Sequence, residues 1–255
     1  MGSIFAEVDS WLIALALAPA MFAAWKFGLW HGQHLRAESG EVPVSKFEDA
    51  SLALLGLLIG FTFSMAIVKH DQRRLMVVAD SNAIGDFYTC ASLLNEPVRT
   101  KLQTVLHSYT KLRLELTGRR LDEATLENAL GQMQQMQDQM TVLVGQALVA
   151  GTPIAVSLTN TLNGVTSNHA ARLAAARDRL PVSVVLLLLI SAVVSSMLVG
   201  REQGASDKAD VAGTVSFIVL ASLAVYVILD LNQPEHGLIT VSQEPIQRLL
   251  SSMLR

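Results

Sequence analysis

Residues 50–68 read ASLALLGLLIGFTFSMAIV, a run of 19 residues without Asp, Glu, Lys or Arg. A helix needs about 20 apolar residues to cross the hydrocarbon core of a bilayer, so this run predicts a transmembrane helix. Residues 180–200 and 211–229 form two more such runs, and a fourth, 10–25, becomes long enough when Lys26 reaches the headgroups. The sequence therefore predicts an all-α integral membrane protein with four transmembrane helices.

The composition agrees with a membrane protein and excludes other classes. Charged residues make up 16% of the 255-residue chain, against about 25% in an average soluble domain. The formal net charge of −3 argues against nucleic-acid binding, which needs a basic face to displace counterions. A single cysteine, Cys90, excludes an internal disulfide and a multi-cysteine zinc site.

The orientation follows from the charges that flank the spans. Four spans place both termini on the same side as residues 69–180, and that side carries most of the basic residues near the membrane. They are Lys69, Arg73, Arg74, Arg172, Arg177 and Arg179. The positive-inside rule then places both termini of this multi-pass membrane protein in the cytoplasm. A cleaved signal peptide is the alternative for the first run, but Glu7 and Asp9 stand where a positive start is needed.

Four segments follow from this topology. Residues 1–68 hold transmembrane helices 1 and 2, and residues 69–180 form a cytoplasmic helical insert. Residues 181–231 hold transmembrane helices 3 and 4, and residues 232–255 form a cytoplasmic tail with a short amphipathic helix. The insert is expected to be a helical bundle continuous with spans two and three, with a kink at Pro181.

The insert has apolar residues at helical spacings of three and four. The second span is expected to continue as one helix to Leu94, and further helices are expected at 97–117, at 122–149 and before span three. Gln137 interrupts the apolar seam of one of them. His169 lies on another seam, where a hydrogen-bonded packing role is expected.

Small residues lie four apart on the second span, at Gly56, Gly60 and Ser64. Such a face lets another helix approach closely, and packing within one subunit is the simplest interpretation. The alternative places this helix around a pore in an oligomer. Leu57, Phe61 and either Ser64 or Met65 would then form an apolar constriction, which gates by dewetting.

Polar residues follow the second span at Asp80, Asn82 and Asp86. They form either a solvated helix surface or the lining of a vestibule, where rings of charge select ions. No charged residue lies at the middle of a span, which argues against a proton pump or a coupled transporter.

No catalytic motif is present, so we expect no enzyme activity and no cofactor. The chain has no Walker motif, no glycine-rich dinucleotide loop, no His-Glu-x-x-His and no Gly-x-Ser-x-Gly. His31 and His34 are close enough to share a metal on a helix, but only Glu38 stands beside them as a further ligand. No metal site is therefore predicted.

Five short stretches carry a resemblance to a known family. They are 54–66, 69–74 and 81–85 around the second span, and 229–234 and 237–245 near the C-terminus. With them the chain resembles the bestrophin-like domain family, a set of mostly bacterial membrane proteins of uncharacterised function. The resemblance covers nearly the whole chain, and it implies a protein of the bacterial inner (plasma) membrane.

The resemblance implies kinship with bestrophins, which are pentameric ion channels with four spans, cytoplasmic termini and a large helical cytoplasmic region. Their second span lines the pore with apolar, Phe-rich residues, so Phe61 is the best candidate for a constriction, with Leu57 beside it. Phe63 lies about 200° further round the helix and faces elsewhere. The family often has an acidic and then a basic residue after span four. Asn232 and Gln233 stand there in this chain, so no charge pair is expected.

Two functions follow as hypotheses. The first is a homo-oligomeric, passive ion channel, pentameric by analogy, whose partners are membrane lipid and inorganic ions. The second is a non-conducting membrane scaffold or sensor whose cytoplasmic helices bind a partner. A small-solute transporter is disfavoured, because it needs broken spans or polar groups at the membrane midplane.

Overall fold

The computed structural model describes residues 9–39, 47–117, 122–206, 209–233 and 237–253. Within these ranges every regular element is a helix. Four helices are long and apolar enough to cross a membrane. They are α2 (Ser10–Ser39), α3 (Phe47–Ser92), α7 (Val182–Ser206) and α8 (Val211–Asn232). The predicted four-span, all-α fold is confirmed.

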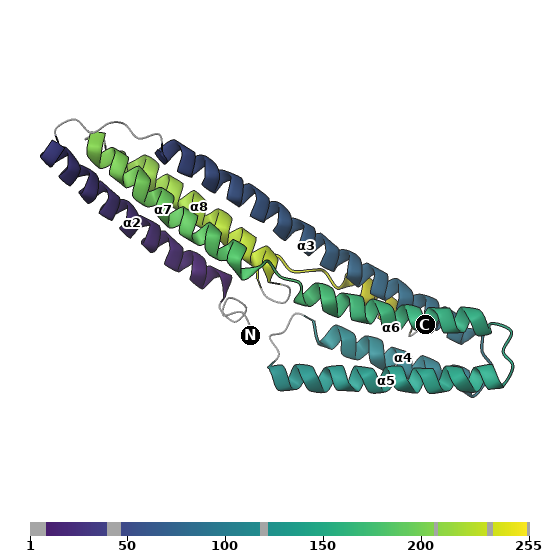
Figure 1. Cartoon of the computed structure of the whole chain (residues 1–255). Coiled ribbons are helices and arrows are strands. Elements are labelled where there is room, and N and C mark those ends of the chain that lie inside the picture. Colours follow the sequence, from purple (N-terminus) through teal and green to yellow (C-terminus); the bar gives the residue numbers. More distant parts are fainter. Residues whose placement is uncertain (1–8, 40–46, 118–121, 207–208, 234–236, 254–255) are drawn as a thin grey trace. The chain divides into compact units, whose positions relative to one another are not determined.

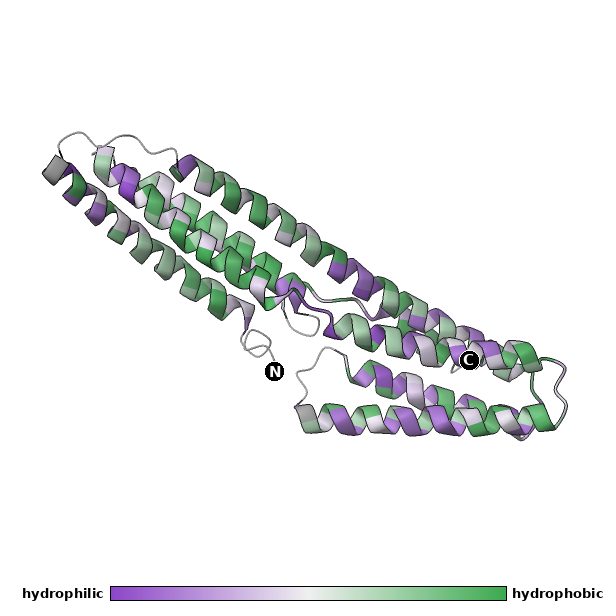
Figure 2. Ribbon diagram, in the orientation of Figure 1, coloured by the Kyte–Doolittle hydropathy of each residue, from purple (hydrophilic) through white to green (hydrophobic). Residues whose placement is uncertain are grey.

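The chain divides into two compact units. The membrane unit comprises Met1–Val68 and Arg179–Gln233, and the bundle unit comprises Lys69–Asp178 and Pro234–Arg255. Helix α3 is one uninterrupted helix that contributes residues to both units. Figure 2 shows mainly hydrophobic residues along α2, α7, α8 and the first part of α3, whereas hydrophilic and hydrophobic residues alternate along the bundle helices.

Helices α2, α7 and α8 pack side by side in the membrane unit (Figure 1). Met21, Leu188 and Val225 lie in their shared core. Helix α3 joins this core through one narrow face, which includes Leu55 and Ala66. Only 17% of its most apolar window is buried, against 22–33% for the other three spans. Most of the membrane part of α3 is therefore left open by the rest of the described chain.

Helices α2 and α7 meet through four glycines, two on each helix. A Cβ atom added at Gly28 would lie 2.0 Å from the carbonyl oxygen of Met197, and one at Gly32 would lie 2.1 Å from that of Arg201. From the other side, a Cβ atom at Gly200 or Gly204 would lie 2.0 or 2.2 Å from a backbone oxygen of α2. The two backbones touch, which is the geometry that small residues permit between membrane helices.

The bundle unit contains the second part of α3, three long helices and one short helix. These are α4 (Val98–Glu115), α5 (Glu123–Val149), α6 (Ala155–Arg177) and α9 (Glu244–Ser252). Asp122 caps α5 by accepting a hydrogen bond from the Thr125 amide at 3.2 Å. Gly151, with a φ of 78°, follows its C-terminal end.

The core of the bundle unit combines side chains from all of these helices. Phe87, Leu106, Met140 and Leu158 are buried in it. Helix α9 packs against α3, because Ser81 donates a hydrogen bond to the Pro245 carbonyl at 3.0 Å. Residues 237–253 are thus grouped with the bundle unit.

The kink expected at Pro181 is a full break in the helix. Helix α6 ends at Arg177 and α7 begins at Val182, since proline lacks an amide donor and disfavours helical backbone in the residue before it. The exposed backbone is satisfied by the Asn232 side chain, which accepts a hydrogen bond from the Leu180 amide at 2.7 Å. Span two is helically continuous with the bundle, whereas span three is joined to it by this break.

Candidate functional site

The predicted pore residues lie on the open side of α3. Leu57 and Phe61 are 56% and 62% exposed, and Ser64 and Met65 are also exposed. Successive residues turn by about 100°, so Ser64 lies about 180° and Phe61 about 120° from the buried Leu55. The rest of the described chain therefore leaves these side chains uncovered.

The small-residue face of α3 meets nothing within the described chain. A Cβ atom added at Gly56 or Gly60 would have no other heavy atom within 4 Å. Close packing of this face within one subunit, the simplest interpretation of its spacing, is not seen among the described residues. The intramolecular close approach lies instead between Gly28, Gly32 and their partners on α7, which the spacing argument overlooked.

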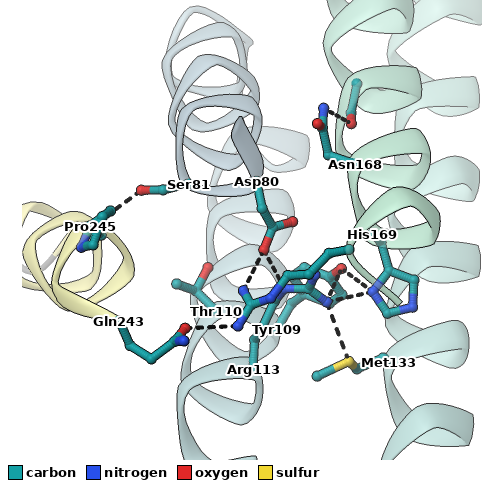
Figure 3. Close-up of polar contacts among 12 residues, drawn as sticks. Asp80, Ser81, Tyr109, Thr110, Arg113, Met133, Asn168, His169, Gln243 and Pro245 are labelled. Carbon is teal, nitrogen blue, oxygen red and sulfur yellow. Dashed lines mark hydrogen bonds and ion pairs between the residues drawn. The ribbon is translucent and has the colours of Figure 1, made fainter. Parts of the chain in front are cut away.

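Asp80 is fully buried in the bundle unit, where two arginines meet its carboxylate (Figure 3). Its Oδ2 atom accepts hydrogen bonds from the Arg113 Nε atom and, at 2.9 Å, from the Arg172 Nη1 atom. Arg172 also donates to the Gln243 Oε1 atom at 2.8 Å. The Asp80 Oδ1 atom has no hydrogen-bond partner within the part of the chain that the structure describes.

The three predicted vestibule residues therefore differ in their surroundings. Asn82 and Asp86 are exposed, whereas Asp80 belongs to a buried ion-pair cluster. A vestibule role stays a prediction for the two exposed residues. Arg113 and Arg172 were not singled out as site residues by the sequence patterns, because charged residues beside an apolar seam resemble a solvated face.

Three polar side chains that stand on apolar seams meet beside this ion pair. The Tyr109 hydroxyl lies 3.2 Å from the His169 Nδ1 atom and accepts a hydrogen bond from the Gln137 Nε2 atom at 3.3 Å. The Arg113 Nη1 atom lies 2.5 Å from the same His169 nitrogen. Burying these groups is tolerated because each satisfies another. The expected hydrogen-bonded packing role of His169 agrees with these contacts.

His169 is held neutral by this arrangement. A guanidinium can only donate, so the Nδ1 atom must accept and the proton must lie on Nε2. Burial, and then the positive charge of Arg113, lower the pKa of His169 from 6.5 to about 4. The opposing charge of Asp80 is too weak to reverse this.

The basic residues at the start of the bundle contact the end of α6. Arg73 is buried, and its Nε and Nη2 atoms donate to the carbonyls of Ala175 and Asp178 at 3.2 and 2.8 Å. The Lys69 Nζ atom lies 2.5 Å from the Asp178 carboxylate. Cations are stabilised at the carbonyl end of a helix. These residues therefore fix the C-terminus of α6 in addition to any role in membrane orientation.

Comparison with protein-family models matches residues 14–246 to the bestrophin-like domain. That match covers most of the chain. The chain belongs to the bestrophin-like family. Comparisons with curated proteins and with solved structures find no match.

In this bestrophin-like protein the two candidate metal-binding histidines are engaged with aromatic rings. His31 stacks on Phe27 with ring centroids 6.5 Å apart, and His34 stacks on Trp30 at 5.7 Å. No group of three or more His, Cys, Asp or Glu side chains suited to a metal occurs among the described residues. The arrangement supplies ring packing near one end of α2.

The neutral His169 makes the stability of the bundle depend on pH. Because the pKa is lower in the folded state, the unfolded chain binds the proton first, and stability present above pH 6.5 falls as the pH drops toward 4. We expect the thermal midpoint of unfolding, followed by circular dichroism, to fall between pH 6.5 and 5.

His169→Asn is the matched variant, since its amide oxygen accepts from Arg113 but does not titrate. Its thermal midpoint should change less over the same pH range. Equal slopes in the native and variant proteins would assign the pH dependence to other groups.

Proposed function

We propose that this bestrophin-like protein is a homo-oligomeric ion channel in which the membrane part of α3 lines the pore. In the proposed topology both termini and the bundle unit lie in the cytoplasm, below the inner membrane. The exposed face of α3 carries this proposal, because the rest of the described chain leaves Leu57 and Phe61 without a partner. Family membership adds support at the level of fold.

The open glycines also favour an assembly of several copies. Lipid covers leucine and phenylalanine well, but a row of Gly56, Gly60 and Ser64 suits the close approach of another helix. With several α3 helices around an axis, these small residues would pack between neighbours. Phe61 and Leu57 would then project toward the axis as an apolar constriction, with Ser64 or Met65 beside them.

Asn82 and Asp86 extend the proposed path into the bundle. Both are exposed on the continuation of α3, about six to seven turns beyond Phe61. In an oligomer the Asp86 carboxylates would form a ring of negative charge, which biases the ions that enter. Pentameric assembly is proposed by analogy with bestrophins.

Phe61→Ala is expected to increase ion flux. Removing the ring widens an apolar constriction and lowers the barrier to wetting, so flux through reconstituted liposomes should rise several-fold. The measurement is ion-selective efflux from vesicles containing purified protein, supported by single-channel recordings.

Phe63→Ala is the matched control for this substitution. Phe63 is the same residue type two positions away, and it lies about 200° round the helix from Phe61. Flux should stay at the native level in this variant. Equal increases or native-like flux for both substitutions would refute a constriction at Phe61. No protein-dependent flux in the native protein or in either variant would favour a non-conducting scaffold.

The subunit arrangement has a direct chemical test. Cys90 is the single cysteine of the chain, and its sulfur lies 3.3 Å from the Ser157 hydroxyl, so Cys90→Ser conserves the contact. In that background, Phe61→Cys should give cross-linked copies on oxidation, whereas the buried Leu55→Cys should not. A strictly monomeric product for both would refute the oligomeric pore.

The scaffold hypothesis has one specific observation in its favour. The bundle exposes large apolar side chains at helix ends, with Val149 92% and Val156 75% exposed. Such residues mark partner surfaces when they are contiguous. Ion flux that rises in Phe61→Ala without a change in assembly would decide against this alternative.

A further inference from the structure

The bundle unit contains a cavity of about 770 Å³. This volume lies within the range of small-molecule sites. Its described lining comes from α3, α4, α5, α6 and residues 237–247, all within the same unit. One part of the lining is apolar and includes Leu126, Leu130 and Leu173. The other part presents Arg113 and Arg172.

Among the described residues, the charges of Asp80, Arg113, Arg172 and His169 do not balance, and the buried Arg73 of the cavity lining adds no negative charge. Arg113 and Arg172 contribute two positive charges, and both bind the single carboxylate of Asp80. His169, which also lines the cavity, accepts from Arg113 and so adds no charge. The buried cluster therefore keeps one positive charge in excess, which costs free energy unless an anion approaches.

The behaviour of Arg172 agrees with this excess. Burial, and next the repulsion of Arg113, lower its pKa, and the attraction of Asp80 is only the third influence. Its second terminal nitrogen is turned to the neutral Gln243 side chain, at 2.8 Å. Gln243 lines the cavity, so the guanidinium of Arg172 lies where a ligand could add the missing charge.

We propose that the cavity binds an amphiphilic organic anion with one carboxylate or phosphate head and an apolar tail. The head would contact Arg172 and Arg113, because guanidinium groups form strong charge-assisted hydrogen bonds to carboxylates and phosphates. The tail would lie along Leu126, Leu130 and Leu173, where burial of its apolar surface is favourable. Ser242 and Gln243 offer further polar contacts near the head.

The probe is sodium decanoate, added to the full-length protein in phosphatidylcholine nanodiscs, which avoid the alkyl tails of detergent. Hydrogen exchange with mass spectrometry reads the response by segment. We expect decanoate to slow exchange in α5 and α6, whereas decanol, which lacks the charge, and acetate, which lacks the tail, should not. Protection by decanol or by acetate alone, or none by decanoate, would overturn the proposal.

Variants separate the cavity from general effects on the fold. Leu130→Trp fills the cavity and should abolish protection, whereas Val142→Trp, on the exposed side of the same helix, should not. Arg172→Gln leaves Asp80 and Arg113 as a one-to-one pair, so the bundle should fold. Its half-saturating decanoate concentration should rise about tenfold, the loss expected for one charged hydrogen bond. Unchanged protection in Leu130→Trp or unchanged affinity in Arg172→Gln would refute the site.

The same assay distinguishes two sources of the anion. Nanodiscs containing phosphatidylglycerol should protect α5 and α6 without added decanoate when the ligand is a membrane lipid. If only soluble carboxylates protect these helices, the ligand comes from the aqueous phase. The test does not depend on conduction, so a negative flux assay leaves this proposal standing.

Discussion

Gly200→Ala is expected to destabilise the membrane unit, although alanine normally favours a helix. The added Cβ atom would lie 2.0 Å from the Trp25 carbonyl oxygen, and a backbone atom cannot move aside as a flexible side chain can. Helices α2 and α7 must therefore separate, at a cost of about 1–3 kcal/mol or more. Trp25 reports this change directly, because it is fully buried and its indole nitrogen donates to Gln203 at 3.1 Å.

The measurement combines thermal unfolding with tryptophan emission. All three tryptophans, Trp11, Trp25 and Trp30, lie on α2, so a shift of emission to longer wavelength reports on the membrane unit. A lower thermal midpoint together with this shift is the expected result.

Gly56→Ala is the matched control. Its effect on stability should be zero or slightly favourable. Gly56 also lies in a membrane helix, but a Cβ atom there meets nothing within 4 Å. Alanine gains up to about 1 kcal/mol over glycine in a helix, so a single chain should be unchanged or slightly stabilised. Any effect at Gly56 should instead appear in the oligomeric state. Equal stability of Gly200→Ala and Gly56→Ala would refute the tight contact between α2 and α7.

The fold could be predicted from sequence because it depends mainly on features that can be read along the chain. Runs of about 20 residues without charge predict transmembrane helices. The helical spacing of apolar residues predicts the bundle helices. The uninterrupted α3 follows from the absence of any helix breaker between residues 50 and 92. Proline at position 181 was expected to bend a helix. Whether the helix bends or breaks there depends on tertiary partners such as Asn232, which residue spacing cannot reveal.

The contacts between helices were harder to predict from the sequence. Gly56 and Gly60 have the same spacing as Gly28 and Gly32, yet only the second pair packs tightly within the described chain. The sequence signal that could have predicted this contact is the facing pair, Gly200 with a second glycine at position 204. Two pairs of glycines with the same spacing in one chain suggest that their helices contact each other. The spacing of small residues predicts that another helix can pack closely there, but it does not identify which helix.

The buried polar cluster around Asp80 is only weakly indicated by the sequence. Gln137 and His169 each interrupt or occupy an apolar seam, and Tyr109 stands on a third. The structure brings these three together. A polar residue on an apolar seam needs a buried partner, so three of them on neighbouring helices could have predicted a shared network. Nothing comparable marked Asp80, since an acidic residue beside exposed Asn82 resembles a solvated surface.

Asp80→Asn should be among the most destabilising single substitutions in the bundle unit. It leaves Arg113 and Arg172 buried with like charges and no carboxylate, and breaking a buried ion pair in this way costs about 3–5 kcal/mol. Hydrogen exchange in α4 and α6 should accelerate, because these helices carry the two arginines. Tryptophan emission should keep its native wavelength, since all three tryptophans lie in the membrane unit.

Asp86→Asn separates the ion pair from a general loss of charge. Asp86 lies on the same helix six residues later and is exposed, so its substitution should change stability by less than about 0.5 kcal/mol. If Asp86 lines a vestibule, the same variant should change ion selectivity without changing stability. Comparable stability of the two variants would mean that the Asp80 carboxylate contributes nothing to the bundle. A second comparison uses Asp80→Asn combined with Arg172→Gln, which restores part of the charge balance and should recover part of the lost stability.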